Sequence, residues 1–357
     1  MSSRSEIYGI QYLRAVAAIS VVMAHSAEMA ASNKYFGREV LGGLLHKGQV
    51  GVDLFFLISG FVITLVAVKG PTLHPRLTLS QFAWRRFARI VPLMWVAILA
   101  YVGLRLLGRG STDVSPYIRA FFLLPGDLAP SVIWTLRHEF VFYIVFALSF
   151  LTIPRRPWIM ALWSLSPLIY LFLALPALTN GSPAGWLGIA TNPVNFEFAA
   201  GMLIGILWHK RTSGLVLRIP VAHPSIVLTA AFCLIVLFAH AIRDISPLAY
   251  RFWIALACAP IVLVAAHAAC SRGVVHRLAL FLGHSSYAIY LFHLHIVSAE
   301  LGVLAHFTPG MPVGLVIVTC TLLATAGGVA IHLLVEKPLV EMVKRLGRRS
   351  QLLSGAT

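Results

Sequence analysis

Charged residues are scarce in this sequence: Asp, Glu, Lys and Arg make up 11% of the 357 residues, whereas 59% are hydrophobic. Soluble domains carry about a quarter charged residues, so this composition excludes an ordinary soluble protein and indicates a polytopic membrane protein. Acidic residues are the scarcest, 12 against 28 Lys and Arg, which gives a formal net charge of +16. The basic residues fall between apolar runs, so membrane topology explains them and we expect no nucleic-acid partner.

Cysteine and several catalytic motifs are also scarce or absent. The four cysteines stand in apolar segments without paired spacing, which favours packing over disulfide or metal binding. The sequence contains no Gly-rich phosphate loop, no G-x-S-x-G motif and no histidine pair with metal-ligand spacing on a soluble segment, so we expect no metal cofactor. We find neither internal repeats nor a second soluble domain, and expect one transmembrane domain over 1–357 with a short basic cytoplasmic tail at 340–357.

Ten apolar stretches are long enough, or nearly so, to cross a bilayer as helices. Lys and Arg concentrate in alternate gaps, on the side of the N-terminus, which places both termini in the cytoplasm. The sequence therefore predicts an all-α polytopic membrane protein with about ten transmembrane helices. The expected spans are residues 10–30, 51–68, 91–107, 133–153, 158–178, 195–208, 226–242, 250–269, 281–305 and 313–335.

The first span carries two ionisable residues, Arg14 and His25. Eleven residues advance a helix by about 1100°, so both side chains share one face, roughly 16 Å apart along the axis. Arg14 would lie near the cytoplasmic surface and His25 in the outer half of the membrane. One interpretation is that Arg14 reaches lipid headgroups and His25 makes a polar helix contact. The other is that both are functional, because ionisable groups inside a membrane are costly.

Asp53 enters the second span, "GVDLFFLISGFVI", near the expected level of His25. A carboxylate at that level could orient an imidazole or raise its basicity. The alternative is that Asp53 stabilises the start of its helix.

Glu139 lies in "WTLRHEFVFY", at the start of the fourth span, and is spaced to share a helix face with Tyr143. It would be the third proton-handling group around one outer cavity. The competing interpretation is a structural pair with Arg137 or His138.

The segment "TLSQFAWRRFARIVPLMW" follows the second span. Thr78 and Gln81 fit a capping box for a short helix. On that helix Arg89 shares a face with both Arg85 and Arg86. Such an arginine cluster suits a phosphate-rich ligand, because guanidinium binds phosphate oxygens bidentately. The alternative is an ordinary positive-inside loop on anionic lipid.

The ninth and tenth spans carry further polar residues. In "LGHSSYAIYLFHLHIV", Tyr287 fits an aromatic belt at the membrane surface, and His293 lies deeper, where it needs a partner. Glu336, which precedes Lys337-Pro338, is a candidate to pair with a loop arginine.

In their order along the chain, these motifs resemble acyltransferase family 3. This family comprises membrane O-acyltransferases that modify bacterial surface and exported glycans and some antibiotics. The resemblance extends from residue 10 to about 338, and its opening is most similar to the branch that acylates exopolysaccharide. The matching motifs are Arg14-x10-His25, "GVDLFFLISGFVI", the F-x2-R-R-x2-R-I-x-P pattern from Phe82 to Pro92, "WTLRHEFVFY", "SSYAIYLFH" and Glu336-x-Pro338.

The resemblance implies a bacterial plasma (inner) membrane enzyme that moves an acyl group, usually acetyl, from cytoplasmic acyl-CoA to a hydroxyl of a glycan or lipid-linked saccharide. His25 would be the general base, with Asp53 or Glu139 orienting its ring. The protein partner is left open between polysaccharide-assembly proteins and a second copy of the chain. The residues expected to hold the donor are Arg14, Arg85, Arg86, Arg89, Tyr287 and His293.

A secondary transporter or flippase for a sugar-linked substrate would also carry intramembrane His, Asp, Glu and Arg residues. It should also show corresponding Gly- or Pro-interrupted segments in its two halves, and we find none. The sequence therefore favours an enzyme.

Overall fold

A computed structural model of the chain describes residues 7–70, 72–108, 113–152, 156–169, 185–211, 223–242, 244–268 and 273–354. The described chain is almost wholly helical, with one pair of two-residue strands. Its elements, in chain order, are α1 (Tyr8–Ala31), the 3₁₀ helix η1 (Leu41–Gln49), α2 (Val50–Ala67), β1 (Val68–Lys69), β2 (His74–Pro75), α3 (Leu79–Leu107), α4 (Ser115–Phe121), α5 (Ile133–Phe150), α6 (Pro157–Ser164), α8 (Gly185–Ala190), α9 (Asn195–Arg211), α10 (Pro224–Ala241), α11 (Pro247–His267), α12 (Val274–Phe307), α13 (Val313–Ile331), the π-helical turn η2 (His332–Glu336) and α14 (Lys337–Ser354).

Eight helical segments of the described chain are long and apolar enough to cross a membrane. This confirms the prediction of an all-α polytopic membrane protein. The segments are Tyr8–Ala31, Leu41–Ala67, Leu79–Leu107, Ile133–Phe150, Pro224–Ala241, Pro247–His267, Val274–Phe307 and Val313–Gly347.

Two of the ten expected spans are not among these eight. The span expected at 158–178 begins with α6 and continues into residues outside the described ones. The span expected at 195–208 corresponds to α9, a helix of 17 residues. The count of ten and the cytoplasmic position of both termini stay predictions.

The helix α3 is longer than the sequence predicts. Instead of a short helix followed by a separate span at 91–107, one continuous helix of 29 residues contains Pro92 in its interior. Its first turn is fixed by the predicted capping box, because the Thr78 hydroxyl accepts from the Gln81 amide and the Gln81 side chain accepts from the Thr78 amide. The arginine cluster therefore lies on the same rigid element as a transmembrane span.

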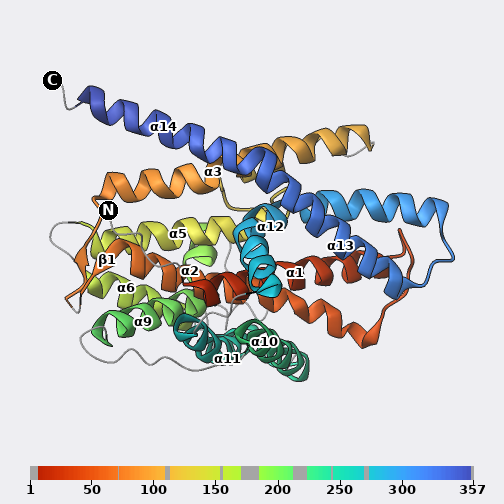
Figure 1. Cartoon of the computed structure of the whole chain (residues 1–357), viewed down its shortest axis with the longest axis horizontal. Helices are drawn as coiled ribbons and strands as arrows, with labels where there is room; N and C mark the ends of the chain where they lie inside the picture. The colour runs from red at the N-terminus through yellow and green to blue at the C-terminus, as the bar shows by residue number, and fades with distance from the viewer. Residues whose placement is uncertain are drawn as a thin grey trace.

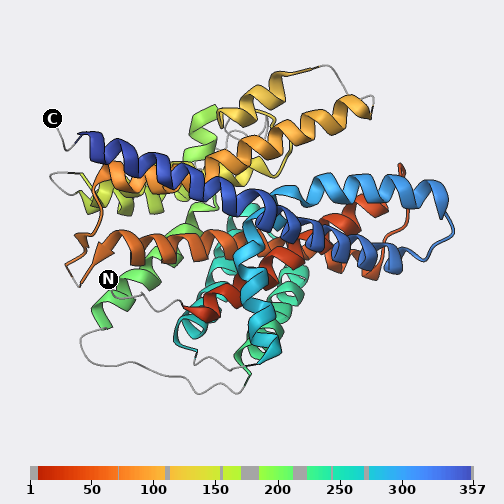
Figure 2. The ribbon, with the colours of Figure 1, turned by 45° about the horizontal axis from the view of Figure 1, so that its top comes forward.

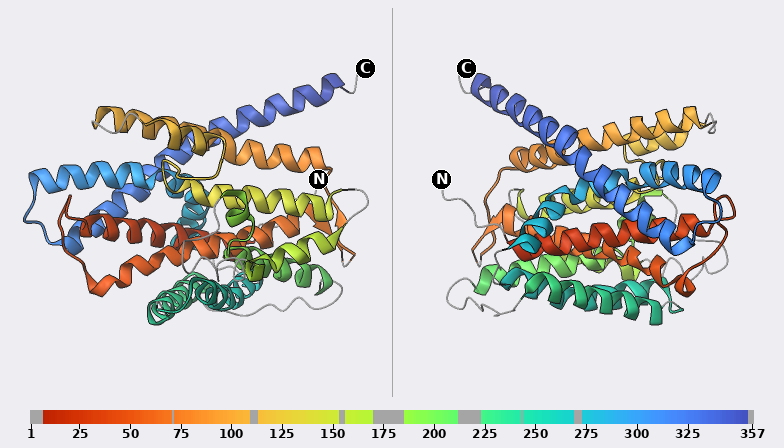
Figure 3. Two further views of the ribbon diagram at one scale, coloured as in Figure 1. Left: turned by 180° about the vertical axis from the view of Figure 1, so that it is seen from behind. Right: turned by 45° about the vertical axis from the view of Figure 1, so that its right-hand side comes forward.

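The helices form a bundle in which most of them run roughly along the long axis of the molecule (Figure 1). In this view α3 and α14 lie at one face of the bundle, and α10 and α11 at the opposite face. The helix α12 changes direction along its length, so that its second part runs beside α13 (Figure 2). The β1–β2 hairpin and the last turns of α14 lie toward the same end of the molecule in both views of Figure 3.

The helices α2 and α9 approach each other too closely for side chains at two glycines. A Cβ atom at Gly60 would collide with the Phe198 carbonyl, and one at Gly201 with the Leu57 carbonyl. Gly60 and Gly201 therefore let the two helices approach each other closely. Beside this contact, the rings of Phe142 and Phe198 stack with centroids 4.5 Å apart and join α5 to the pair.

Candidate functional site

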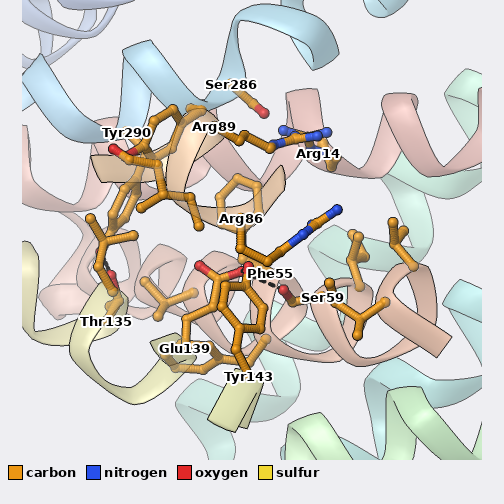
Figure 4. A pocket seen from close by; sticks show the side chains of 18 residues that line it. Arg14, Phe55, Ser59, Arg86, Arg89, Thr135, Glu139, Tyr143, Ser286 and Tyr290 are labelled. Carbon is orange, nitrogen blue, oxygen red and sulfur yellow. Dashed lines mark hydrogen bonds between the residues drawn. The ribbon is translucent and has the colours of Figure 1, made fainter. Parts of the chain in front are cut away.

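One pocket opens among α1, α2, α3, α5 and α12, with an empty volume of about 870 Å³ including its open mouth. Its polar lining comes from every one of these helices, and its apolar lining comes mainly from α2. In Figure 4 the arginine side chains reach toward one side of the pocket, whereas Thr135 and Tyr290 lie at the other. The pocket is therefore basic at one side and carries hydroxyl groups and aromatic rings at the other.

Three of the four arginines expected to hold the donor line this pocket: Arg14 from α1, and Arg86 and Arg89 from α3. Arg85 is exposed and is not part of the lining. The guanidinium of Arg86 lies 5.9 Å from the ring centroid of Tyr143. The Nε atom of Arg86 is buried and makes no hydrogen bond within the described chain. An N–H group in that position can bind an anionic ligand.

Glu139 also lines the pocket and is the carboxylate that faces the arginines. It accepts hydrogen bonds from the Tyr143 hydroxyl and, at 2.5 Å, from the Ser59 hydroxyl. The predicted pairing of Glu139 with Tyr143 is therefore confirmed. Its alternative partners lie elsewhere: Arg137 donates to two loop carbonyls, and a ring nitrogen of His138 bonds to a backbone carbonyl.

Tyr287, another of the residues expected to hold the donor, lines the pocket. Its hydroxyl donates to the Ile90 carbonyl at 2.8 Å and so joins α12 to the part of α3 that carries the arginines. At the other side of the pocket, the hydroxyls of Tyr290 and Thr135 lie 3.0 Å apart.

His25 and His293 do not line the pocket but lie next to it and contact each other. Nδ1 of His25 is 3.2 Å from Nε2 of His293, and the His293 ring lies 5.8 Å from the ring of Tyr290. Nδ1 of His25 also lies 3.0 Å from the Val21 carbonyl oxygen. A carbonyl oxygen only accepts, so Nδ1 carries the hydrogen, and Nε2 of a neutral His25 can accept a proton.

The structure corrects the expected outer cluster of His25, Asp53 and Glu139. Asp53 is buried and forms an ion pair with Arg251 of α11. Glu139 faces the arginines of the pocket. Neither carboxylate orients His25, because the structure places a second histidine beside its Nδ1 instead.

Comparison with known proteins identifies the family of the chain. The family model described as "Acyltransferase domain" matches residues 7–332. The chain belongs to this acyltransferase family. It is therefore a multi-pass membrane acyltransferase, an enzyme that transfers acyl groups.

Curated relatives extend the family assignment. The acyltransferase is 30% identical to the exopolysaccharide production protein ExoZ of Rhizobium meliloti, over 86% of this chain and 93% of that one. It is 26% identical to the peptidoglycan O-acetyltransferase OatA of Listeria monocytogenes, over 87% of this chain and 52% of OatA. It is 25% identical to the acyltransferase MdmB of Streptomyces mycarofaciens, over 94% of this chain and 92% of MdmB. No solved structure matches the chain.

Sequence reasoning about this acyltransferase missed a buried charge cluster, which consists of Asp53, Glu197 and Arg251. The Arg251 Nη1 atom lies 3.6 Å from a Glu197 oxygen and also bonds to Asp53. Glu197 is fully buried, and neither of its carboxylate oxygens has a hydrogen-bond partner in the described chain. The available signal was an acidic residue inside an expected span, since such residues are rarely left without a partner.

The prediction that Glu336 pairs with a loop arginine is wrong. Its carboxylate lies 2.6 Å from Nδ1 of His332, one turn earlier, instead of pairing with a loop arginine. Both residues belong to the π-helical turn η2, and both are buried. The spacing of four residues was legible in the sequence.

Proposed function

We propose that this acyltransferase moves an acyl group, acetyl in the simplest case, from acyl-CoA in the pocket to a hydroxyl of a glycan, with His25 as the general base. The observation that carries the proposal is the pocket with three arginines and one carboxylate, next to a histidine whose Nε2 can take a proton. The donor enters from the cytoplasm, and the acceptor reaches His25 from the opposite face of the membrane.

The pocket suits both chemical parts of an acyl-CoA. Three guanidinium groups against one carboxylate favour a ligand with several negative charges, such as the phosphates of coenzyme A. The apolar wall from α2, which includes Phe55, Val62 and Ile63, suits an uncharged chain. With the phosphates at the arginines, the acyl end extends toward Thr135 and Tyr290 and so toward the histidine pair.

The transfer step follows from this placement. The acceptor hydroxyl gives its proton to Nε2 of His25 while its oxygen attacks the thioester carbonyl carbon. The carbon–sulfur bond then breaks, and the imidazolium returns the proton to the departing thiolate. The product is an ester on the acceptor and free coenzyme A.

The functions of two relatives support a glycan acceptor. One relative is a peptidoglycan O-acetyltransferase and another an exopolysaccharide production protein. We propose that the acceptor here is likewise a hydroxyl of a cell-surface or exported polysaccharide, in free or lipid-linked form.

The decisive test uses the purified protein in vesicles with radiolabelled acetyl-CoA and surface glycan from the host. We expect wild type to label the glycan, and His25→Ala to lower kcat by about 100-fold or more, because a general base typically contributes 10²–10⁴-fold. His267→Ala is the matched control, because this half-buried histidine of α11 lies outside the pocket, where it hydrogen-bonds to the Leu263 carbonyl and packs against the ring of Trp208. Equal transfer by wild type and His25→Ala would refute the role of His25.

A second candidate activity is transport or flipping of a sugar-linked substrate. The same experiment distinguishes it, because a transporter moves the saccharide across the vesicle membrane without forming a labelled ester. Transport without any label in the glycan would favour this second activity.

A further inference from the structure

His293 is a buried histidine with a defined pattern of contacts, and the proposed reaction does not yet use it. It lies on α12 and is fully buried. Its Nδ1 lies 2.6 Å from the Tyr290 carbonyl oxygen. Because that oxygen can only accept, Nδ1 of His293 carries a hydrogen, and Nε2 of the neutral ring has a free lone pair.

This lone pair faces the Nδ1–H group of His25. The two backbone carbonyls fix both rings in the same tautomer, with the hydrogen on Nδ1. The hydrogen on Nδ1 of His25 is therefore shared between the Val21 carbonyl at 3.0 Å and Nε2 of His293 at 3.2 Å. Each of the two histidines thus presents its Nε2 as a hydrogen-bond acceptor.

We propose that His293 is a positioning residue for His25. Its Nε2 accepts from Nδ1–H of His25, holds the ring so that Nε2 of His25 faces the acceptor hydroxyl, and stabilises the imidazolium formed during transfer. In a serine–histidine–aspartate triad a buried carboxylate has this role, whereas here a neutral imidazole has it. The inference rests on the proposed role of His25 as the base.

The surroundings of His25 support this assignment. The two carboxylates expected to orient the ring are bound elsewhere, Asp53 to Arg251 and Glu139 to Ser59 and Tyr143. Glu28, one turn after His25, is exposed and accepts from the Gln49 amide. Within the part of the chain that the structure describes, the side chain hydrogen-bonded to His25 is that of His293.

The proton follows a closed path in this arrangement. The acceptor hydroxyl loses its proton to Nε2 of His25, and Nδ1–H of the resulting imidazolium stays hydrogen-bonded to His293. The proton on Nε2 then moves to the thiolate of coenzyme A, which restores the neutral histidine pair. His293 contacts neither the acyl group nor the acceptor.

Two substitutions of His293 separate this role from a purely structural one. His293→Gln places an amide oxygen near the former Nε2 position and keeps a hydrogen-bond acceptor for Nδ1–H of His25. The shorter side chain in His293→Asn reaches only the former Nδ1 position. We expect His293→Asn to lower kcat by about 10- to 100-fold and His293→Gln by less than about fivefold, because only the first removes the group that holds the base. The KM for acetyl-CoA should change by less than about twofold in both, since neither substitution touches the donor pocket.

His295 supplies the matched control. It lies two residues further along α12, is also buried, and bonds through Nε2 to the Ala97 carbonyl on α3 at 2.9 Å. His295→Gln and His295→Asn should give a kcat close to that of wild type. Melting temperatures in detergent show whether each variant is folded.

Three outcomes would overturn the inference. Equal losses of kcat in the Gln and Asn variants would show that transfer does not depend on a hydrogen-bond acceptor at the Nε2 position of residue 293. A kcat like that of wild type in both would show that His293 has no part in transfer. A raised KM for acetyl-CoA with unchanged kcat would return His293 to donor binding.

The assay includes His25→Ala, so the two proposals fail in different ways. An active His25→Ala refutes the base itself, whereas an inactive His25→Ala with a fully active His293→Asn refutes only the positioning role. If His293→Asn does not fold, ¹⁵N NMR of histidine-labelled wild type decides the question. We expect the hydrogen on Nδ1 of His25, and a hydrogen on its Nε2 instead would contradict the inference.

Discussion

The pocket and the buried charge cluster use the same residue types in opposite proportions. The pocket sets three arginines against Glu139 and is open. The buried charge cluster sets Arg251, whose side chain is 25% exposed, against two carboxylates that solvent hardly reaches: Asp53 is 3% exposed and Glu197 is fully buried. An excess of cations around empty space indicates an anionic ligand, whereas closely packed opposite charges hold helices together. The number of charged residues therefore says less about function than the space that they surround.

The largest expected effect comes from breaking the buried charge cluster. Arg251→Leu leaves two carboxylates buried without their cation, which should cost about 3–5 kcal/mol of folding free energy. We expect a large drop in the melting temperature in detergent and little folded protein in the membrane.

Two further variants sharpen this prediction. Adding Asp53→Asn and Glu197→Gln to Arg251→Leu should restore most of the melting temperature, because no unpaired charge then remains. Arg105→Leu, at an exposed arginine in the last turn of α3, should have little effect. If Arg251→Leu melted like wild type but bound acetyl-CoA weakly, the distinction between the two regions would be wrong.

An intermediate effect is expected from the pocket. Arg86→Ala and Arg89→Ala should each weaken acetyl-CoA binding by about 10- to 100-fold, since each removes a charge-assisted bond to phosphate worth about 1.5–3 kcal/mol. Binding of labelled acetyl-CoA to the purified protein measures this change. Arg85→Ala is the control on the same helix and should bind as wild type does. If all three substitutions weakened acetyl-CoA binding equally, the arginines would act only through the overall positive charge of this surface.

The smallest effect is expected from Glu139→Gln. The amide keeps a hydrogen-bond acceptor for Ser59 and Tyr143 while it removes the negative charge from the pocket. Acetyl-CoA should bind as tightly as to wild type or about 2–5-fold more tightly, with kcat within about tenfold. A loss of kcat of about 100-fold or more, without a change in binding, would restore a direct role for Glu139 in proton transfer.

The sequence predicted those features that depend on near neighbours or on composition. The capping box at Thr78, the Glu139–Tyr143 pair and the membrane class were confirmed. Spacing along a helix specifies such contacts, and hydropathy specifies the class.

Contacts between distant segments could not be predicted in this way. His25 and His293 are 268 residues apart, Asp53 and Arg251 are 198 apart, and Glu139 and Ser59 are 80 apart. The expected topology gave the approximate depth of each group but not its angle around the bundle. For this reason Asp53 and Glu139 were expected beside His25, although they face other helices.

The helix α2 connects the two charged regions, because Asp53 and Ser59 both lie on it. They are separated by about 240° around the helix and about 9 Å along it. The ion pair with Arg251 fixes the axial position and rotation of α2, and the glycine contact with α9 prevents the helix from sliding. The buried charge cluster thus holds α2 in place at Asp53. Because α2 is a continuous helix, this also fixes the position of Ser59 relative to Glu139.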